Sequence, residues 1–233
     1  TWYGGKFSTS RNRGIFMDQA LELLPADYWR WHLMANAPES DDASFTLEHF
    51  AGVANKDLAD VLGNFVNRIT RFCASKFGQE IPAAGAYGET EENLIADLDA
   101  KIAAYTAALE AMEFRKAFAE LRGIWVAGNE YLQIAAPWTA FKTDPDRAAA
   151  GVRAGLNLIA LFAALSAPVI PNTAEKMFAI FGLDPKAAGK WPTSARAALS
   201  FLKPGHKFDL PDVLFKKIED EQIAEWREKF GAE

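Results

Sequence analysis

Apolar side chains recur every three or four positions through most of the chain, which is the spacing of helices with one buried face. The clearest stripe runs through residues 55–77 and consists of Leu58, Leu62, Phe65, Ile69 and Phe72. Alternation of apolar and polar residues, which would indicate strands, is nearly absent. The pattern therefore predicts an all-α protein in which residues 55–77 form an amphipathic helix.

Prolines, glycines and small polar residues divide the remaining sequence into further helices. We expect one or two short helices within residues 15–36 and a cap for the next helix at Ser44 or Thr46. Longer helices are predicted over residues 93–112, 114–134, 144–165, 173–181 and 218–230. The first two should pair antiparallel, and the next two should close a helical bundle, with residues 78–92 forming an exposed loop and residues 218–230 a tail helix.

Composition narrows the class of protein. The chain has 233 residues, 50% of them hydrophobic, which is enough for one substantial core. We expect no apolar run long enough to span a bilayer and see no signal-peptide pattern, so a cytoplasmic protein is predicted. The only cysteine, Cys73, excludes an internal disulfide framework and a multi-cysteine zinc site, and its apolar neighbours predict a buried thiol.

The charge restricts how this protein can contact nucleic acids. A formal net charge of −6 argues against indiscriminate binding, so we expect no DNA partner, and any RNA site would have to be local. One candidate lies on the polar side of the 55–77 helix, where Asn64 and Arg68 fall one turn apart and Arg71 follows. An amide and a guanidinium together suit base edges and phosphates. By spacing alone, however, such a row is more typical of a solvated helix face.

A second candidate lies in the first ten residues. The segment Gly4–Ser10 combines two glycines, three hydroxyl side chains and the Lys6 cation. Backbone amides, hydroxyls and a cation are the groups that hold a transferring phosphate. Taken alone, clusters of these residue types are mostly solvated turns.

Several motifs follow this loop along the chain. They are Gly14–Ala20, Asp27–Met34, Pro38–Asp41, Asn55–Leu58, Leu62–Asn64, Asn129–Tyr131, Ala136–Trp138, Lys203–Gly205 and Leu214–Phe215. The series resembles the C-terminal portion of a class I aminoacyl-tRNA synthetase, and the methionyl-tRNA synthetase family is the best match. The resemblance extends over essentially the whole chain.

The resemblance implies roles for the loop residues. Residues 6–10 are similar to the family signature Lys-Met-Ser-Lys-Ser, with Phe7 in place of the methionine and Thr9 in place of the second lysine. The implied ATP-binding residues are Lys6, Phe7, Ser8, Thr9 and Ser10, of which Lys6, Ser8 and Ser10 would be catalytic. Because Thr9 cannot supply a second cation, Arg11 or Arg13 is expected to assist.

The resemblance also implies an RNA site. Asn64 and Arg68 would select a base of the methionine tRNA anticodon, and Trp138 would stack on a base, with Pro137 fixing the turn that presents the indole. The inner side of the tRNA stem would lie along the connector. The aromatic residues Tyr28, Trp29 and Trp31 of that connector form either a docking surface or part of the core.

Three units are implied by the same resemblance. Residues 1–45 would hold the end of the catalytic region and the connector, residues 46–200 the helical-bundle anticodon-binding domain, and residues 201–233 a tail helix that packs back toward the catalytic region. The intact enzyme would join methionine to its tRNA through methionyl-adenylate, using ATP with Mg²⁺. Because the chain begins in mid-motif at Thr1, we expect this segment alone to be inactive and to hold no metal site.

Two alternatives remain open at this stage. The chain could belong to another class I synthetase, because the cysteinyl, isoleucyl, leucyl and valyl enzymes share such a loop and a helical anticodon domain. It could instead be a free-standing helical RNA-binding module that retains the loop without catalysis.

Overall fold

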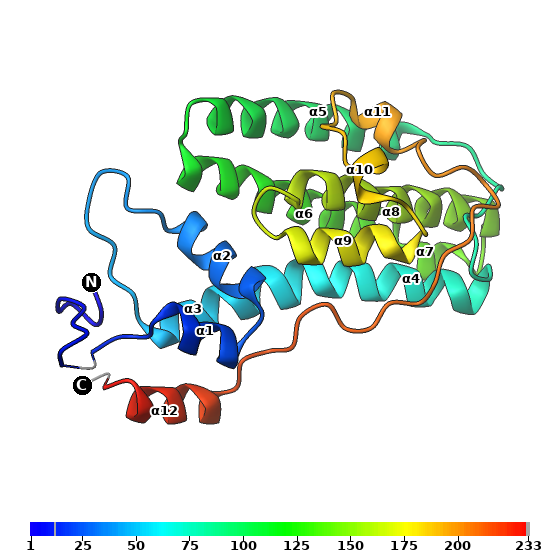
Figure 1. Ribbon diagram of the computed structural model, residues 1–233. Coiled ribbons are helices and arrows are strands. Elements are labelled where there is room, and N and C mark those ends of the chain that lie inside the picture. The colour runs from blue at the N-terminus through cyan, green and yellow to red at the C-terminus, as the bar shows by residue number, and fades with distance from the viewer. Residues whose placement is uncertain (12, 232–233) are drawn as a thin grey trace.

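The computed structural model describes residues 1–11 and 13–231. Residue 12, in the predicted unit 1–45, and residues 232–233, in the predicted unit 201–233, lie outside the described residues. Its helices are α1 (Met17–Leu23), α2 (Ala26–Ala35), α3 (Leu47–Val53), the π-helical η1 (Ala54–Gly63), α4 (Asn64–Lys76), α5 (Glu89–Glu110), α6 (Phe114–Ala135), α7 (Pro137–Ala140), α8 (Pro145–Ser166), α9 (Pro171–Ile180), α10 (Pro185–Ala188), α11 (Ala195–Ala198) and α12 (Asp220–Lys229). Across the described residues only isolated β-bridges occur and no strand forms, which confirms the all-α prediction (Figure 1).

The bundle is built around α8. Helices α5 and α6 form the expected antiparallel pair, and α8 packs against α4, α6, α7 and α9. By length and composition α8 could span a membrane, so the expectation that no apolar run is long enough was wrong. Its side chains are buried from Ala148 onward except at Arg153, because neighbouring helices surround it. Helix α8 is therefore the central core helix of this bundle.

A glycine sets how closely α4 approaches α8. A Cβ atom on Gly155 would lie 2.8 Å from Cγ1 of Ile69, which is closer than packed carbon atoms come. The apolar stripe faces this contact: Leu58, Leu62, Phe65 and Ile69 are fully buried. Only Phe72, near the end of the stripe, is half-buried. The outer end of α4 thus emerges from the core with an aromatic side chain at the surface.

The helix predicted over residues 55–77 begins earlier than expected. Helices α3, η1 and α4 follow one another without a break from Leu47 to Lys76, and the Thr46 side chain caps α3 by accepting a hydrogen bond from the amide of His49 at 3.2 Å. In the π-helical turns of η1, each backbone amide bonds to the carbonyl five residues earlier instead of four. The side-chain amide of Asn129 in α6 donates to the carbonyl of Val61 in these turns, at 3.1 Å. This bond joins the long helix to α6.

The loop before α5 is more ordered than its composition predicts. Most of residues 78–88 are exposed and non-helical, as predicted, but Ile81 and Pro82 are buried and α5 already begins at Glu89, so the loop is shorter than expected. The guanidinium of Arg153 donates to four successive carbonyls, those of residues 82–85, at 2.6 to 3.2 Å. Long-range hydrogen bonds from α8 therefore hold a glycine- and alanine-rich segment that has little side-chain packing of its own.

The connector packs into the bundle. Tyr28, Trp29 and Trp31 of α2 are each at most 5% exposed, so these aromatic residues belong to the core and do not form a docking surface. The indole of Trp31 donates to Asp57 of η1 at 3.2 Å, and Arg122 of α6 bonds the other oxygen of the same carboxylate. This arrangement ties α2, η1 and α6 together.

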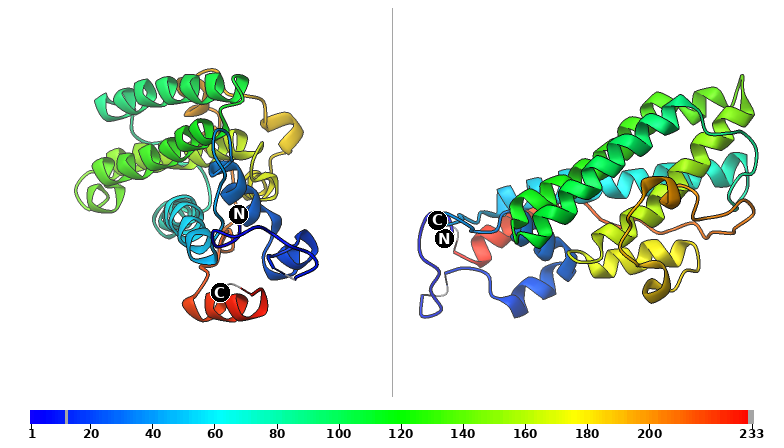
Figure 2. Two further views of the ribbon diagram at one scale, coloured as in Figure 1. Left: turned by 90° about the vertical axis from the view of Figure 1, so that its left-hand side faces the viewer. Right: turned by 90° about the horizontal axis from the view of Figure 1, so that it is seen from above.

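The C-terminal segment returns to the N-terminal one. Asn55 exchanges two hydrogen bonds with the backbone of Ile218, each 2.8 Å long. Arg227 of α12 pairs with Glu48 at 3.0 Å and lies over the ring of Tyr3, 5.7 Å from its centroid. Figure 2 shows α12 and the N-terminal segment at one end of an elongated molecule, with α7 at the other.

Candidate functional site

A strained turn presents Trp138. Ala136 adopts φ 38° and ψ 58°, a left-handed conformation that residues with a Cβ atom rarely take, and it ends α6. Pro137, the first residue of α7, is buried, and its ring suits a helix start because a proline has no amide hydrogen to leave unpaired. The turn places the indole of Trp138 beside Phe72 of α4.

The structure brings Arg68 and Trp138 together although they are 70 positions apart. The guanidinium carbon of Arg68 lies 4.5 Å from the centroid of the Trp138 ring, a cation–π contact. Phe72 meets the same indole edge-on, with centroids 6.2 Å apart and planes at 88°. Asn64 is exposed one helical turn before Arg68 on the same side of α4. We refer to Asn64, Arg68, Phe72 and Trp138 as the α4–α7 cluster.

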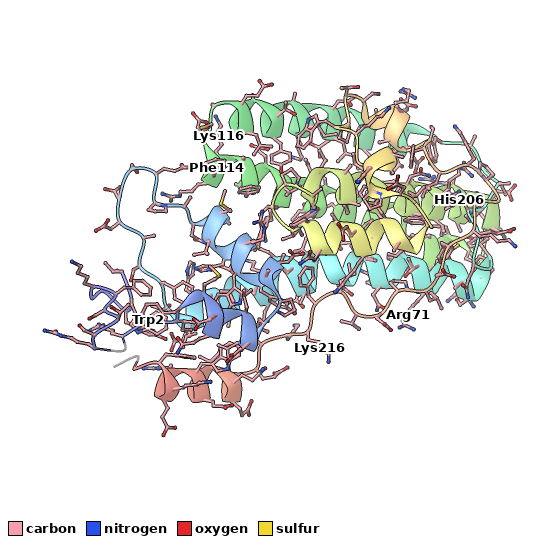
Figure 3. All side chains as sticks on the ribbon, in the orientation of Figure 1. Trp2, Arg71, Phe114, Lys116, His206 and Lys216 are labelled. Carbon is pink, nitrogen blue, oxygen red and sulfur yellow. The ribbon has the colours of Figure 1, made fainter. Side chains whose placement is uncertain are left out.

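Sequence reasoning missed the aromatic and basic residues beside this cluster. Phe141 meets Phe72 edge-on with centroids 6.3 Å apart, and the ammonium of Lys76 lies 5.6 Å from the Phe141 centroid. The sequence spacing could have indicated both residues. Phe141 follows Trp138 by three positions and Lys76 follows Arg68 by eight, spacings that place each pair on a similar side of the chain. Arg71 is exposed on α4, as Figure 3 shows, and donates to Asn67 at 2.6 Å.

A buried carboxylate fixes the helices that carry the turn. Glu91, in the first turn of α5, is fully buried and accepts hydrogen bonds from the Tyr131 hydroxyl of α6 at 2.5 Å and from Arg147 of α8 at 2.8 Å. Its other oxygen accepts from the amide of Gly88 at 2.9 Å. Burial alone would raise the pKa of Glu91, but these bonds outweigh it and hold that pKa below its ordinary value.

The loop at the other end of the molecule is a short hairpin. The backbones of Ser8 and Arg13 exchange two hydrogen bonds, of 3.0 and 2.9 Å. The Ser8 hydroxyl oxygen lies 3.3 Å from that of Ser10 and accepts a bond from the amide of Arg11, also at 3.3 Å. The turn therefore gathers two hydroxyls and a cationic side chain at its tip. Lys6 is exposed just before the hairpin.

Aromatic residues anchor this hairpin to the connector. Phe7 packs 5.8 Å from the buried Trp2 ring and covers Gly14, where a Cβ atom would lie 2.3 Å from the Phe7 ring. Trp2 in turn stacks on Phe45 at 5.6 Å. Phe7 and Phe45 also line an apolar cavity of about 100 Å³, together with Trp29 and other connector side chains. The position of the loop thus depends on the connector.

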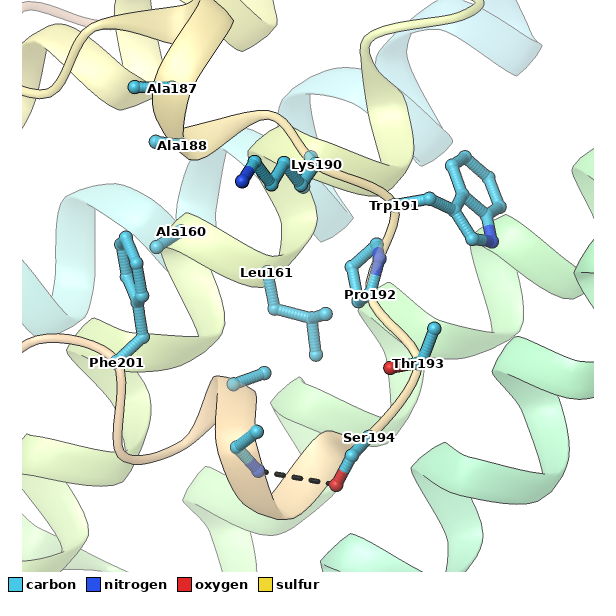
Figure 4. Close-up of a pocket in the computed structure, with 13 residues that line it drawn as sticks. Ala160, Leu161, Ala187, Ala188, Lys190, Trp191, Pro192, Thr193, Ser194 and Phe201 are labelled. Atoms are coloured by element: carbon cyan, nitrogen blue, oxygen red, sulfur yellow. Dashed lines mark hydrogen bonds between the residues drawn. The ribbon is translucent and has the colours of Figure 1, made fainter.

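A larger cavity of about 260 Å³ lies between α8 and the segment that joins α10 to α11 (Figure 4). Small and apolar side chains dominate its lining, including Ala160, Leu161 and Phe201, with Lys190 as the charged residue among them. It shares no lining residue with the hairpin or the α4–α7 cluster. We assign this cavity no part in the candidate site.

Comparison with known proteins identifies the family. Residues 81–233, well over half of the chain, match the profile described as the anticodon binding domain of methionyl tRNA ligase. The chain belongs to the methionyl-tRNA ligase family. Residues 1–70 match the profile of class I tRNA synthetases of the methionine type. Both matches support the methionyl assignment over the cysteinyl, isoleucyl, leucyl and valyl alternatives.

Curated relatives in this family carry the name methionine–tRNA ligase. One from Ruegeria sp. strain TM1040 is 60% identical over 228 residues, which are 98% of this chain and 39% of that protein. One from Cereibacter sphaeroides is 59% identical over the same share of each. The chain therefore spans about two fifths of the length of these relatives.

Solved structures agree on the fold. Methionyl-tRNA synthetase of Mycobacterium tuberculosis in its free state has a TM-score of 0.76 with 23% identity, covering 86% of this chain and 40% of that one. The same enzyme bound by methionyl-adenylate has a TM-score of 0.75. The helical arrangement is thus shared with a methionyl-tRNA synthetase even at low identity.

Proposed function

We propose that this segment of a methionyl-tRNA ligase binds the anticodon loop of methionine tRNA at the α4–α7 cluster. The observation that supports the proposal is the stacking of Arg68 on one face of Trp138, because it presents a guanidinium and an indole together on a surface that is otherwise well packed. Single-stranded RNA is recognised by bases that stack on aromatic or guanidinium planes and bond through their edges.

Each side chain of the α4–α7 cluster would make a different contact with the RNA. Trp138 supplies a stacking face, and Phe72 holds the indole from the side so that little rotamer freedom is lost on binding. Arg68 reaches base edges or a phosphate with its fork of donors. Asn64, exposed one turn away, both donates and accepts hydrogen bonds, so it can distinguish one base from another. Pro137 fixes the turn that presents the indole.

For the whole enzyme we propose the two-step joining of methionine to tRNA, with the Lys6–Ser10 hairpin contacting the phosphates of ATP. A carboxylate oxygen of methionine attacks the α-phosphorus, and the bond from that phosphorus to the bridging oxygen breaks. Pyrophosphate leaves with the electron pair. A ribose hydroxyl of the tRNA later attacks the carbonyl carbon of the adenylate, the bond from that carbon to the phosphate oxygen breaks, and AMP leaves. Lys6, Ser8 and Ser10 would stabilise the charge on the pyrophosphate, while Mg²⁺ would accompany ATP.

Among the described residues no group of three or more histidine, cysteine and acidic side chains is placed to hold a metal ion. We propose that residues 1–45 serve the catalytic part, 46–200 the anticodon and 201–233 the return to the catalytic part, and that the enzyme works in the cytoplasm. Because the chain spans about two fifths of the length of its relatives, we propose that the segment alone does not form the adenylate.

The anticodon proposal is tested by binding. The chain is titrated with a methionine tRNA and with a copy that has one anticodon base changed, before and after Trp138→Ala. Loss of one stacked base costs about 1 to 3 kcal/mol, so Trp138→Ala should weaken binding of the cognate tRNA by roughly 5- to 150-fold and abolish the difference between the two RNAs. Trp138→Phe should retain part of both.

Phe201→Ala is the matched control, because Phe201 is an aromatic residue that is 46% exposed and lines the cavity away from the cluster. It should leave the affinity and the discrimination unchanged. Equal affinity of the unmodified chain for both RNAs would contradict the proposal, and so would an equal loss on Phe201→Ala.

A further inference from the structure

The hairpin segment has a charge unlike that of the rest of the chain. Residues 1–17 contain Lys6, Arg11 and Arg13 and no acidic side chain, in a protein whose formal net charge is −6. Such a local excess of positive charge attracts an anion. The three cations do not have the same surroundings, and the structure separates their roles.

Arg13 has a structural position. Its side chain is half-buried and lies against Gly5, where a Cβ atom would be only 2.3 Å from the Arg13 Nη2 atom. The same nitrogen donates to the carbonyl of Trp2 at 3.3 Å. Arg13 therefore holds the two arms of the segment together, and moving its side chain to a ligand would break the hydrogen bond to Trp2.

Arg11 has the opposite surroundings. Its side chain is exposed and has no hydrogen-bond or ion-pair partner among the described residues, while its backbone amide bonds to the Ser8 hydroxyl. It stands in the same turn as Thr9, two positions further along and between the paired residues Ser8 and Arg13. The guanidinium thus extends from the tip that also carries the two serine hydroxyls.

We propose that Arg11 supplies the second cation of the hairpin and contacts the departing pyrophosphate, while Arg13 only positions the loop; this inference rests on the proposed function of the hairpin. As the bond between the α-phosphorus and the bridging oxygen breaks, negative charge grows on that oxygen, and Lys6 and Arg11 share it. Thr9 can donate only one neutral hydrogen bond, so the charge must come from a neighbouring position.

Such a contact strengthens as the reaction proceeds. A cation that meets charge developing in the transition state raises the rate of the chemical step more than it tightens binding of ATP. Loss of Arg11 should therefore appear in the rate of adenylate formation and much less in the KM for ATP. If Arg11 were merely structural, its loss would not lower the rate while sparing the KM for ATP. A lysine at position 9 would then not restore the rate.

The test uses a full-length ligase that carries this segment and measures exchange of pyrophosphate into ATP. Arg11→Ala should lower the maximal rate on the order of 10²-fold, with the KM for ATP changed less than about threefold. Arg11→Lys should retain much of the rate. The double variant Thr9→Lys with Arg11→Ala should recover most of it, because the charge returns to the same turn. Lys186→Ala removes an exposed lysine elsewhere and should have no effect.

Different outcomes overturn different statements. If Lys6→Ala lowers the rate and Arg11→Ala does not, the assignment of Arg11 is wrong while the proposed function of the hairpin stands. If neither variant changes the rate, the proposed function of the hairpin itself fails. A loss on Arg11→Ala that neither lysine variant recovers would show that shape, and not charge, matters at position 11, which also refutes the inference.

Discussion

The Glu91 network offers the sharpest test of how the bundle holds the turn that carries Trp138. Glu91→Ala removes the acceptor for the Tyr131 hydroxyl, for Arg147 and for the amide of Gly88 at once. Breaking a buried ion pair costs about 3 to 5 kcal/mol, and a buried hydroxyl without a partner about 1 to 3 kcal/mol. The two costs do not simply add, because both arise from loss of the same carboxylate. The Arg147 side chain is 29% exposed, which lowers the cost of breaking the ion pair.

We therefore expect Glu91→Ala to reduce the free energy of unfolding by about 3 to 5 kcal/mol. For a chain of this size, that corresponds to a melting temperature lower by roughly 6 to 20 °C. Glu91→Gln keeps an acceptor for Tyr131 but loses the charge, so its cost should be smaller, about 1 to 3 kcal/mol. Urea unfolding followed by circular dichroism measures both.

The same network predicts a pH dependence of stability. Because the pKa of Glu91 is held below its ordinary value in the folded protein, its carboxylate stabilises the fold above about pH 4.5, and this contribution is lost as the pH falls through the lowered pKa. Glu91→Gln should flatten the fall in stability on the acid side, and the two curves should converge at low pH. Parallel curves would refute the view that Glu91 is ionised in the folded protein.

Glu92→Ala is the matched control for these measurements. Glu92 is the next residue, also a glutamate and also paired with an arginine, Arg196, but its side chain is 48% exposed. Exposed ion pairs contribute little to stability because water screens them. A loss on Glu92→Ala as large as that on Glu91→Ala would show that burial of the network is not the cause.

Two further predictions concern the core. Gly155→Ala should destabilise the chain by about 1 to 3 kcal/mol because the new Cβ atom collides with Ile69. The control is Gly123→Ala on α6, where a Cβ atom meets nothing within 4 Å, so this change should be neutral or stabilising. Equal effects of the two changes in thermal melts would contradict the close α4–α8 contact. Burial, with the charge of Glu80, raises the pKa of Cys73 to about 12, so the thiol should react with an alkylating reagent only after unfolding in urea, and rapid labelling of the native chain would show otherwise.

Local periodicity was sufficient to locate most helices. The stripe from Leu58 to Ile69 is buried as predicted, and the pairs α5–α6 and α8–α9 lie where apolar spacing and prolines indicated. These features could be predicted because residues three or four apart lie on the same face of a helix, so a buried face appears as apolar residues at that spacing. The same reasoning did not predict how the loop before α5 is held, since the bonds that hold it come from Arg153, about 70 positions away.

The sequence by itself determined the helices, the resemblance to methionyl-tRNA synthetases and the residue types of both candidate sites. Only the tertiary structure decided that Arg68 lies over Trp138, that Arg13 is held against Gly5 while Arg11 is exposed, and that the connector aromatics are core. Each of these depends on how separate helices and loops pack. Local spacing restricts which side chains share a face, but long-range packing determines which faces meet and which cations remain available to a ligand.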